Sequence, residues 1–245
     1  MRALFVQQDH VSPTGPVGER FEQRGYELVE FPVVPAERFH APDVEVAFPD
    51  PRDYDVIVPM GAPWSVYDEV AIGAWVAAEL DFLRRAHRSG VPVLGICFGG
   101  QALAAALGGR VERGPEPEIG WYAIETVAPG LIEAGPWFQW HHDRWSPPPE
   151  ATPLAWTPVA PQAFTVGRSL AVQFHPELTV AMLDGWLGNG GGEWVTAHGG
   201  DVERLAAMTR AEEPAAVVRA HRLVDRFLDQ VATRPHRPGG SPAAG

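Results

Sequence analysis

One short run constrains this chain more than any other. It covers residues 95–99 (GICFG), follows the apolar residues 91–94 and leads into the helical sequence 101–107. A strand that stops at a Gly-x-nucleophile-x-Gly turn and continues as a helix is a nucleophile elbow, which holds one side chain on a strained corner above a sheet. Glycine suits the flanking positions because the backbone comes close to its neighbours there. The start of a helix also favours the thiolate form of a cysteine, so the run predicts that Cys97 is a nucleophile.

A second motif bears on the same question, because a lone cysteine in an apolar stretch is usually a small core residue. The motif is FHPE at 174–177, directly after the apolar strand predicted at 169–173. A histidine at a strand end, with a carboxylate two residues later, can supply a base and the group that orients it. His175 and Glu177 therefore favour a catalytic Cys97 over a structural one, and the alternative for His175 is a satisfied structural histidine.

The chain resembles the class I glutamine amidotransferases, which use a Cys-His-Glu triad. The resemblance runs from about residue 2 to about residue 230 and is strongest to stand-alone domains similar to the amidotransferase half of GMP synthetase. It is carried by five ordered motifs: GAPWSVYD at 61–68, the elbow, EIGW at 118–121, WHHD at 140–143 and FHPE at 174–177. Proteins similar to intracellular proteases place a histidine after the nucleophile, where this chain has Phe98. Serine hydrolases with an elbow take their acid from before the histidine, whereas Glu177 follows His175.

The resemblance implies a thiol mechanism for three of these residues. Cys97 attacks the γ-carbonyl of glutamine or of a γ-glutamyl amide and forms a glutamyl thioester. His175 protonates the departing nitrogen and later activates water, while Glu177 fixes the imidazole tautomer. No metal and no cofactor is expected in this chemistry.

The resemblance also implies an oxyanion hole made of backbone amides. One donor is Phe98, directly after the nucleophile, and the other comes from the turn at Gly61 and Ala62. The family usually has Gly-Gly-Pro at this turn, whereas this chain has Gly-Ala-Pro. If the turn requires a positive φ at Ala62, we expect the hole to be strained.

Further positions match family residues near the substrate. Gln101 matches a position that contacts substrate glutamine, and its alternative is a glutamine on a helix surface. Glu118, Gly120 and Trp121 match a loop that holds the amino-acid head, where Glu118 could pair with the α-ammonium or be an ordinary solvated acid.

The WHHD motif admits a metal site as an alternative. Adjacent histidines on a strand point to opposite faces and do not easily bind one ion, so we expect no metal there. The resemblance instead places His142 and Asp143 beside the active site, where one of them orders the loop that contains His175.

The composition excludes several function classes. All 19 basic residues are arginine, and against 31 acidic residues they leave a net charge of −12. A chain without lysine has no Walker A lysine and no pyridoxal Schiff base, so we expect no ATP-driven ligation within it. The negative charge also argues against sequence-independent nucleic-acid binding. One cysteine permits no internal disulfide, and we find no signal or membrane stretch, so we expect a soluble cytoplasmic protein.

The order of predicted elements indicates an α/β fold. Strands are predicted at 2–8, 26–34, 55–58 and 91–96, with helices at 17–24 and 70–89 between them. This alternation is typical of a mostly parallel sheet with helices on both faces, and the resemblance implies the flavodoxin-like amidotransferase fold. After residue 110, short strands are predicted at 119–127, 151–157, 162–167 and 169–174, as an antiparallel extension of the sheet.

The C-terminal part carries helical apolar spacing at 200–211 and 214–232. We expect these segments to form a helical cap on one amidotransferase domain spanning 1–232, followed by a disordered tail at 233–245.

Three functions stay open at this point. The chain is a glutaminase that passes ammonia to a separate synthase, or a solitary hydrolase of γ-glutamyl amides or peptides. The third is a non-enzymatic regulatory or binding module on the same fold. The presence of Cys97, His175 and Glu177 together argues against the third.

Overall fold

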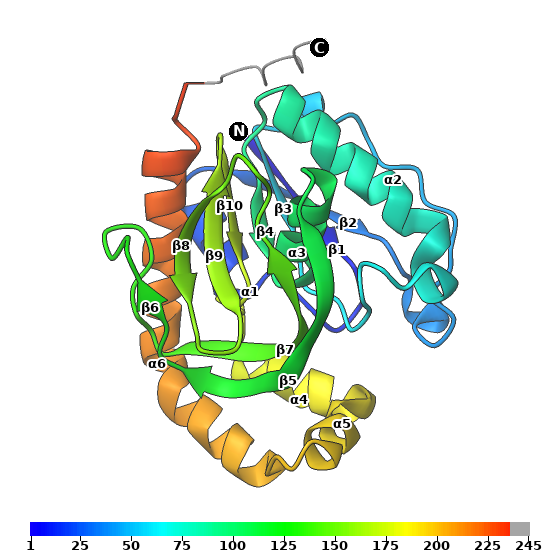
Figure 1. Ribbon diagram of the computed structural model, residues 1–245, viewed down its shortest axis with the longest axis vertical. Helices are drawn as coiled ribbons and strands as arrows, with labels where there is room; N and C mark the ends of the chain where they lie inside the picture. Colours follow the sequence, from blue (N-terminus) through cyan, green and yellow to red (C-terminus); the bar gives the residue numbers. More distant parts are fainter. Residues whose placement is uncertain (236–245) are drawn as a thin grey trace.

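The computed structural model describes residues 1–235 and shows a mixed sheet covered by helices (Figure 1). The strands are β1 (Arg2–Gln7), β2 (Glu27–Pro32), β3 (Val56–Pro59), β4 (Leu94–Ile96), β5 (Arg110–Tyr122), β6 (Glu125–Thr126), β7 (Trp137–Ser146), β8 (Thr152–Trp156), β9 (Pro161–Val166) and β10 (Ser169–Val172). The helices are α1 (Gly15–Gln23), α2 (Glu69–Arg88), α3 (Phe98–Ala106), α4 (Val180–Trp186), α5 (Gly192–Ala197) and α6 (Val202–Arg226). None of the helices in the described part of the chain has the length and apolar character that a membrane span requires.

The strands form one sheet in the order β2-β1-β3-β4-β10-β9-β8-β6, in which a parallel bridge between Ile57 and Val93 joins β3 to the start of β4. The first five strands run parallel, and β9, β8 and β6 follow in antiparallel pairing. The predicted parallel sheet with an antiparallel extension is therefore confirmed. The segment 169–172 is the exception, because it pairs in parallel with β4 as well as antiparallel with β9.

Alternating side chains of β1 reach both faces of the sheet, as expected for a strand buried on both sides. Ala3 and Phe5 pack on the face covered by α1 and α6. Leu4 and Val6 pack on the opposite face, which α2 and α3 cover. The sheet thus holds the strand ends at a rigid edge between two helical layers.

A long antiparallel ribbon of β5 and β7 lies apart from the main sheet, beside α4 and α5 (Figure 1). The predicted strand at 119–127 is wrong in extent, because β5 begins at Arg110 and residues 125–126 form a separate strand on β8. Strand β7 and the helices α4 and α5 are absent from the predicted order of elements. Their sequences mix tryptophan, histidine and glycine without a clean period of 2 or 3.6, which is the signal that such predictions need.

The C-terminal helices also differ from the prediction. The two expected helices, 200–211 and 214–232, form the single helix α6, which runs through Pro214 and ends in a π-helical turn at Phe227–Val231. Proline removes one helical hydrogen bond, but buried residues on both sides of it, such as Leu205 and Leu223, hold the helix on the domain. The predicted tail at 233–245 lies, beyond residue 235, outside the described residues.

Candidate active site

The nucleophile elbow forms where the sequence predicts it. Cys97 lies between β4 and α3 with φ 49° and ψ −109°, and no other non-glycine residue among residues 1–235 has a positive φ. Such a conformation costs energy and persists only where the surrounding structure enforces it. Here the Cys97 N–H donates to the carbonyl of Val172 at 2.8 Å, and the Gly99 N–H donates to that of Met60 at 3.0 Å. The elbow is therefore tied to the strands on both sides.

The two elbow glycines are required by close backbone contacts. A Cβ at Gly99 would come 2.0 Å from the carbonyl oxygen of Pro59, and one at Gly95 would come 2.8 Å from the Cα of Gly100. Neither contact is possible for a larger residue without moving backbone. The GICFG sequence is thus explained by the packing of α3 against the sheet.

His175 and Glu177 follow β10 and form a buried pair. The imidazole Nδ1 lies 2.7 Å from Oε1 of Glu177, and the two residues are 5% and 0% exposed. The His175 N–H donates to the carbonyl of Phe138 at 2.9 Å, which fixes the loop. The Nε2 atom is buried and makes no hydrogen bond of ordinary length to another described residue.

The charge environment of His175 favours its protonated form. Burial by itself lowers the pKa of His175, but the charges of Cys97 and Glu177 and hydrogen bonds to them outweigh burial and raise the pKa well above its ordinary value of 6.5. An imidazolium beside a cysteine stabilises the thiolate that a nucleophile needs.

The turn at Gly61 and Ala62 closes the site on the side of the expected oxyanion hole. A Cβ at Gly61 would come 2.9 Å from Cε1 of His175 and 3.8 Å from Cβ of Cys97, so the turn contacts both residues. Ala62 lines the pocket beside Cys97 and does not have a positive φ. The substitution of alanine for the family's second glycine therefore brings no backbone strain.

A pocket of about 700 Å³ opens beside Cys97, and a smaller one of about 100 Å³, which shares Ala62 and Pro63 with it, lies against His175. Gln101, His142 and Asp143 line the larger pocket, as the sequence predicts. The Gln101 Nε2 donates to the backbone carbonyl of Asp143 at 3.2 Å, and the Asp143 carboxylate accepts from the Tyr67 hydroxyl at 2.8 Å.

The side chains of His142 and Asp143 do not hold the triad loop by hydrogen bonds. Across residues 1–235, no hydrogen bond joins either side chain to His175 or Glu177, and the Phe138 carbonyl holds the loop instead. Burial and the nearby Arg113 charge lower the pKa of His142, which favours a neutral ring at the pocket wall. The structure thus keeps these residues at the pocket and does not support their predicted role in ordering the loop.

The three predicted head-group residues on β5 do not line either pocket. Glu118 is 2% exposed, and its Oε2 accepts from Thr157 and Gln162 at 3.0 Å each. Trp121 donates its indole N–H to Thr209 on α6, and Gly120, with φ 114°, lies under Leu205 of the same helix. The prediction fails because the register of β5 on β7 turns Glu118 into the domain and places Gly120 and Trp121 against α6.

The structure also brings residues to the site that the sequence reasoning missed. Gln173 donates from Nε2 to the Cys97 sulfur at 3.5 Å, and the Trp186 ring lies 4.9 Å from that of His175. Gln173 is two residues before His175, and that spacing could have indicated a shared direction. Trp186 lies in α4, for which the sequence offers no periodic signal. The described residues contain no group of three or more side chains arranged to hold a metal ion.

Comparison with known proteins identifies what the chain is similar to. A family model described as glutamine amidotransferase class-I matches residues 19–185. The glutamine-hydrolyzing GMP synthase of Aeropyrum pernix is 37% identical over 136 residues, which cover 50% of this chain and 27% of that protein. The corresponding enzyme of Nitrobacter hamburgensis is 36% identical over 146 residues, covering 55% of this chain and 25% of that protein. The matched stretch thus spans about a quarter of the length of these relatives.

Solved structures show the same fold over nearly the whole chain. A glutamine amidotransferase from Thermotoga maritima superposes with a TM-score of 0.79 at 23% identity, covering 94% of this chain and 99% of that one. A glutamine amidotransferase from Methylobacillus flagellatus gives a TM-score of 0.79 at 23% identity and covers 98% of each chain. The predicted α/β fold is therefore confirmed.

Proposed function

The chain belongs to the class-I glutamine amidotransferase family, and we propose that it hydrolyses the side-chain amide of glutamine with Cys97 as nucleophile. One observation carries the proposal: His175 is held at Nδ1 by Glu177 and keeps a buried Nε2 available beside Cys97. A base oriented by an acid, with its second nitrogen turned to a nucleophile, is the arrangement that thiol acyl transfer requires.

The first half of the proposed reaction forms a thioester. The Cys97 thiolate attacks the γ-carbonyl, and the new C–S bond places a negative charge on the carbonyl oxygen. The backbone N–H groups of Phe98 and Ala62 are the proposed donors to that oxyanion. The imidazolium of His175 gives its Nε2 proton to the amide nitrogen, the C–N bond breaks, and ammonia leaves.

The second half hydrolyses the thioester. The neutral Nε2 of His175 takes a proton from water, and the hydroxide attacks the same carbonyl carbon. Collapse of the tetrahedral intermediate breaks the C–S bond and releases glutamate and the Cys97 thiolate. Glu177 stabilises the imidazolium in both halves, and the net reaction converts glutamine and water into glutamate and ammonia.

We further propose that the ammonia serves a separate synthase. The curated relatives described above are named glutamine-hydrolyzing GMP synthases, and this chain matches about a quarter of each. These 245 residues contain no lysine, so a Walker A ATP site does not lie among them.

A second candidate is hydrolysis of a γ-glutamyl amide of a larger amine. The pocket beside Cys97 has a volume of about 700 Å³ and is walled by Trp64, Trp140 and Trp194, which is far more space than the release of ammonia needs. Aromatic walls of this kind suit an apolar or cationic substituent on the amide nitrogen.

Release of glutamate by the purified chain from glutamine and from a series of γ-glutamyl amides tests the two candidates. Slow hydrolysis of glutamine that rises when an ammonia-using synthase is added supports the first. Fast hydrolysis of a bulky γ-glutamyl amide by the chain alone supports the second. No glutamate from any of these substrates, with or without a synthase, would favour the non-enzymatic module.

A further inference from the structure

Gln173 is a buried polar side chain that the mechanism above does not use. It is 0% exposed, and its Nε2 points at the Cys97 sulfur from 3.5 Å. Its backbone N–H donates to the carbonyl of Gln162 at 2.9 Å, so its position is fixed by the sheet. The Cys97 sulfur therefore has a neutral N–H donor at hydrogen-bond distance.

The orientation of the Gln173 amide follows from its neighbours. Amide oxygen and nitrogen are interchangeable in shape, so the assignment must come from groups whose role is fixed. A backbone carbonyl can only accept, and the Asp143 carbonyl accepts from Gln101 Nε2. The Gln101 Nε2 also donates to Oε1 of Gln173 at 3.2 Å. Because Oε1 of Gln173 lies on that side, Nε2 of Gln173 faces the Cys97 sulfur.

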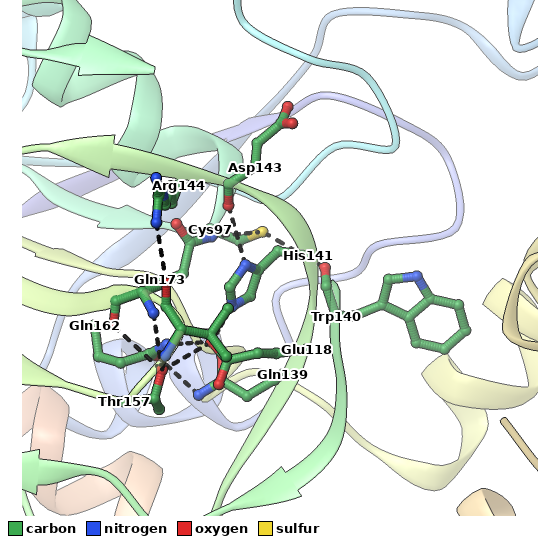
Figure 2. Close-up of polar contacts among 12 residues, drawn as sticks. Cys97, Glu118, Gln139, Trp140, His141, Asp143, Arg144, Thr157, Gln162 and Gln173 are labelled. Carbon is green, nitrogen blue, oxygen red and sulfur yellow. Dashed lines mark hydrogen bonds and ion pairs between the residues drawn. The ribbon is translucent and has the colours of Figure 1, made fainter. Parts of the chain in front are cut away.

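The polar chain continues away from the nucleophile into the domain. His141 places Nδ1 3.0 Å from the Asp143 carbonyl and Nε2 3.2 Å from Oε2 of Glu118. Figure 2 shows Cys97, Gln173, His141 and Glu118 gathered in this one cluster. The amide that faces the sulfur is thus anchored through Gln101 and Asp143 to a second buried histidine–glutamate pair.

We propose that Gln173 is a further catalytic residue, which donates an N–H to the Cys97 thiolate and holds the sulfur while His175 serves the substrate. The inference rests on the proposed role of Cys97. His175 must turn its proton to the leaving nitrogen and then to water, so it does not stay on the sulfur through the cycle. Gln173 is neutral, cannot lose its donor at any working pH, and keeps one hydrogen bond to sulfur when the thiolate is expelled from the thioester.

Alkylation of Cys97 by iodoacetamide tests the contact without any substrate. The chain has one cysteine, so all thiol labelling reports that site. Gln173→Met keeps length and volume but removes the donor, and a lost hydrogen bond to a charged group corresponds to a change of about tenfold in the equilibrium between thiol and thiolate. The midpoint of the alkylation rate should move up by about one pH unit, and kcat for glutamate release should fall while KM stays near that of the wild type.

Gln139→Met is the matched control. Gln139 is also 0% exposed and also donates to a glutamine, Gln162, but it does not contact the sulfur. Its alkylation profile should follow the wild type even if its stability falls. A folded Gln173→Met chain with the wild-type profile would overturn the proposal.

The wild-type chain gives a second test if Gln173→Met does not fold. The side-chain amide proton signals of Gln173 should shift in NMR spectra with the same pH midpoint as alkylation, and signals that ignore that midpoint would overturn the proposal. Failure of the proposed function looks different. In that case the chain releases no glutamate, while the alkylation midpoint still depends on Gln173.

Discussion

Two buried histidine–glutamate pairs lie among residues 1–235, and we propose that only one of them serves catalysis. His175 and Glu177 are two residues apart on one loop, with 2.7 Å between Nδ1 and Oε1. His141 and Glu118 face each other across the β5–β7 ribbon, with 3.2 Å between Nε2 and Oε2. Both histidines are nearly inaccessible, at 5% and 6% exposure, so burial does not distinguish the pairs.

The two pairs differ in the groups that lie next to the ring nitrogens. His141 has an acceptor oxygen near each nitrogen, since its Nδ1 lies 3.0 Å from the Asp143 carbonyl. Glu118 is likewise occupied by two further donors. Nε2 forms no hydrogen bond to a described residue in either histidine, but that of His175 has Cys97 as its neighbour. The two pairs therefore differ in the neighbour of Nε2, which is a carboxylate at His141 and the proposed nucleophile Cys97 at His175.

The largest expected effect separates the two histidines directly. His175→Asn removes the acid and base of both half-reactions, so kcat for glutamate release should fall by roughly 10³- to 10⁴-fold. His141→Asn, the matched change in the other pair, should lower kcat by less than about tenfold because it acts only through the position of Gln101 and Gln173. Equal losses of kcat in the two variants would mean that the two histidines do not differ in their role.

Of the two glutamates in these pairs, we expect Glu177 to have the larger effect on kcat. Glu177→Gln leaves the pocket intact but misorients the imidazole, so we expect a drop in kcat of about 10³-fold with little change in KM. Steady-state kinetics on folded protein, with circular dichroism as the check of folding, measures this. Wild-type turnover in the variant would mean that another group orients His175.

A third buried acid shows what a carboxyl group does without a histidine. Glu79 is 0% exposed and accepts one hydrogen bond, from Gln8 at 2.7 Å. Burial raises the pKa of Glu79 from 4.5 to about 8, against that hydrogen bond. The folded chain holds this proton more tightly than the unfolded chain, so its contribution to stability is complete below pH 4.5 and is lost as the pH rises through about 8.

Urea unfolding at pH 5 and pH 9 tests Glu79. The wild type should lose several kcal/mol of unfolding free energy relative to Glu79→Gln between these two conditions, because the variant has no proton to release. If the unfolding free energies of the wild type and of Glu79→Gln changed equally between pH 5 and pH 9, Glu79 would not be a neutral acid in the folded chain.

The smallest effect is expected at Glu118. Glu118→Gln weakens its contacts to Thr157, Gln162 and His141, which should cost about 1–3 kcal/mol of unfolding free energy and lower kcat only a few-fold. Denaturant unfolding and kinetics on the same preparation measure both quantities. A loss of activity as large as that of Glu177→Gln would place Glu118 in the reaction itself.

The predictable part of this molecule is the part encoded locally. The elbow at 95–99 and the FHPE motif each set their own backbone geometry within a few residues, so Cys97, His175 and Glu177 could be assigned to one site without knowing the fold. The parallel sheet followed from alternating strand and helix patterns. The helix through Pro214 was not predictable, because tertiary packing overrides the local signal there.

The positions of the predicted substrate-binding residues depend on pairing between strands that are distant in the sequence. Glu118, Gly120 and Trp121 were assigned to the pocket by motif, but the register of β5 on β7 turns them into the domain and toward α6. The same pairing opposes Glu118 to His141 and creates the second pair. Spacing along the chain carries no information on such register.

The most direct test of the central claim uses an electrophilic glutamine analogue on the intact chain. It should attach once per molecule, at Cys97, with activity lost in proportion to labelling and with glutamine protecting the site. His175→Asn should slow this labelling, whereas His141→Asn should leave it near the wild-type rate. Activity that survives full labelling, or a label attached elsewhere than Cys97, would contradict the account.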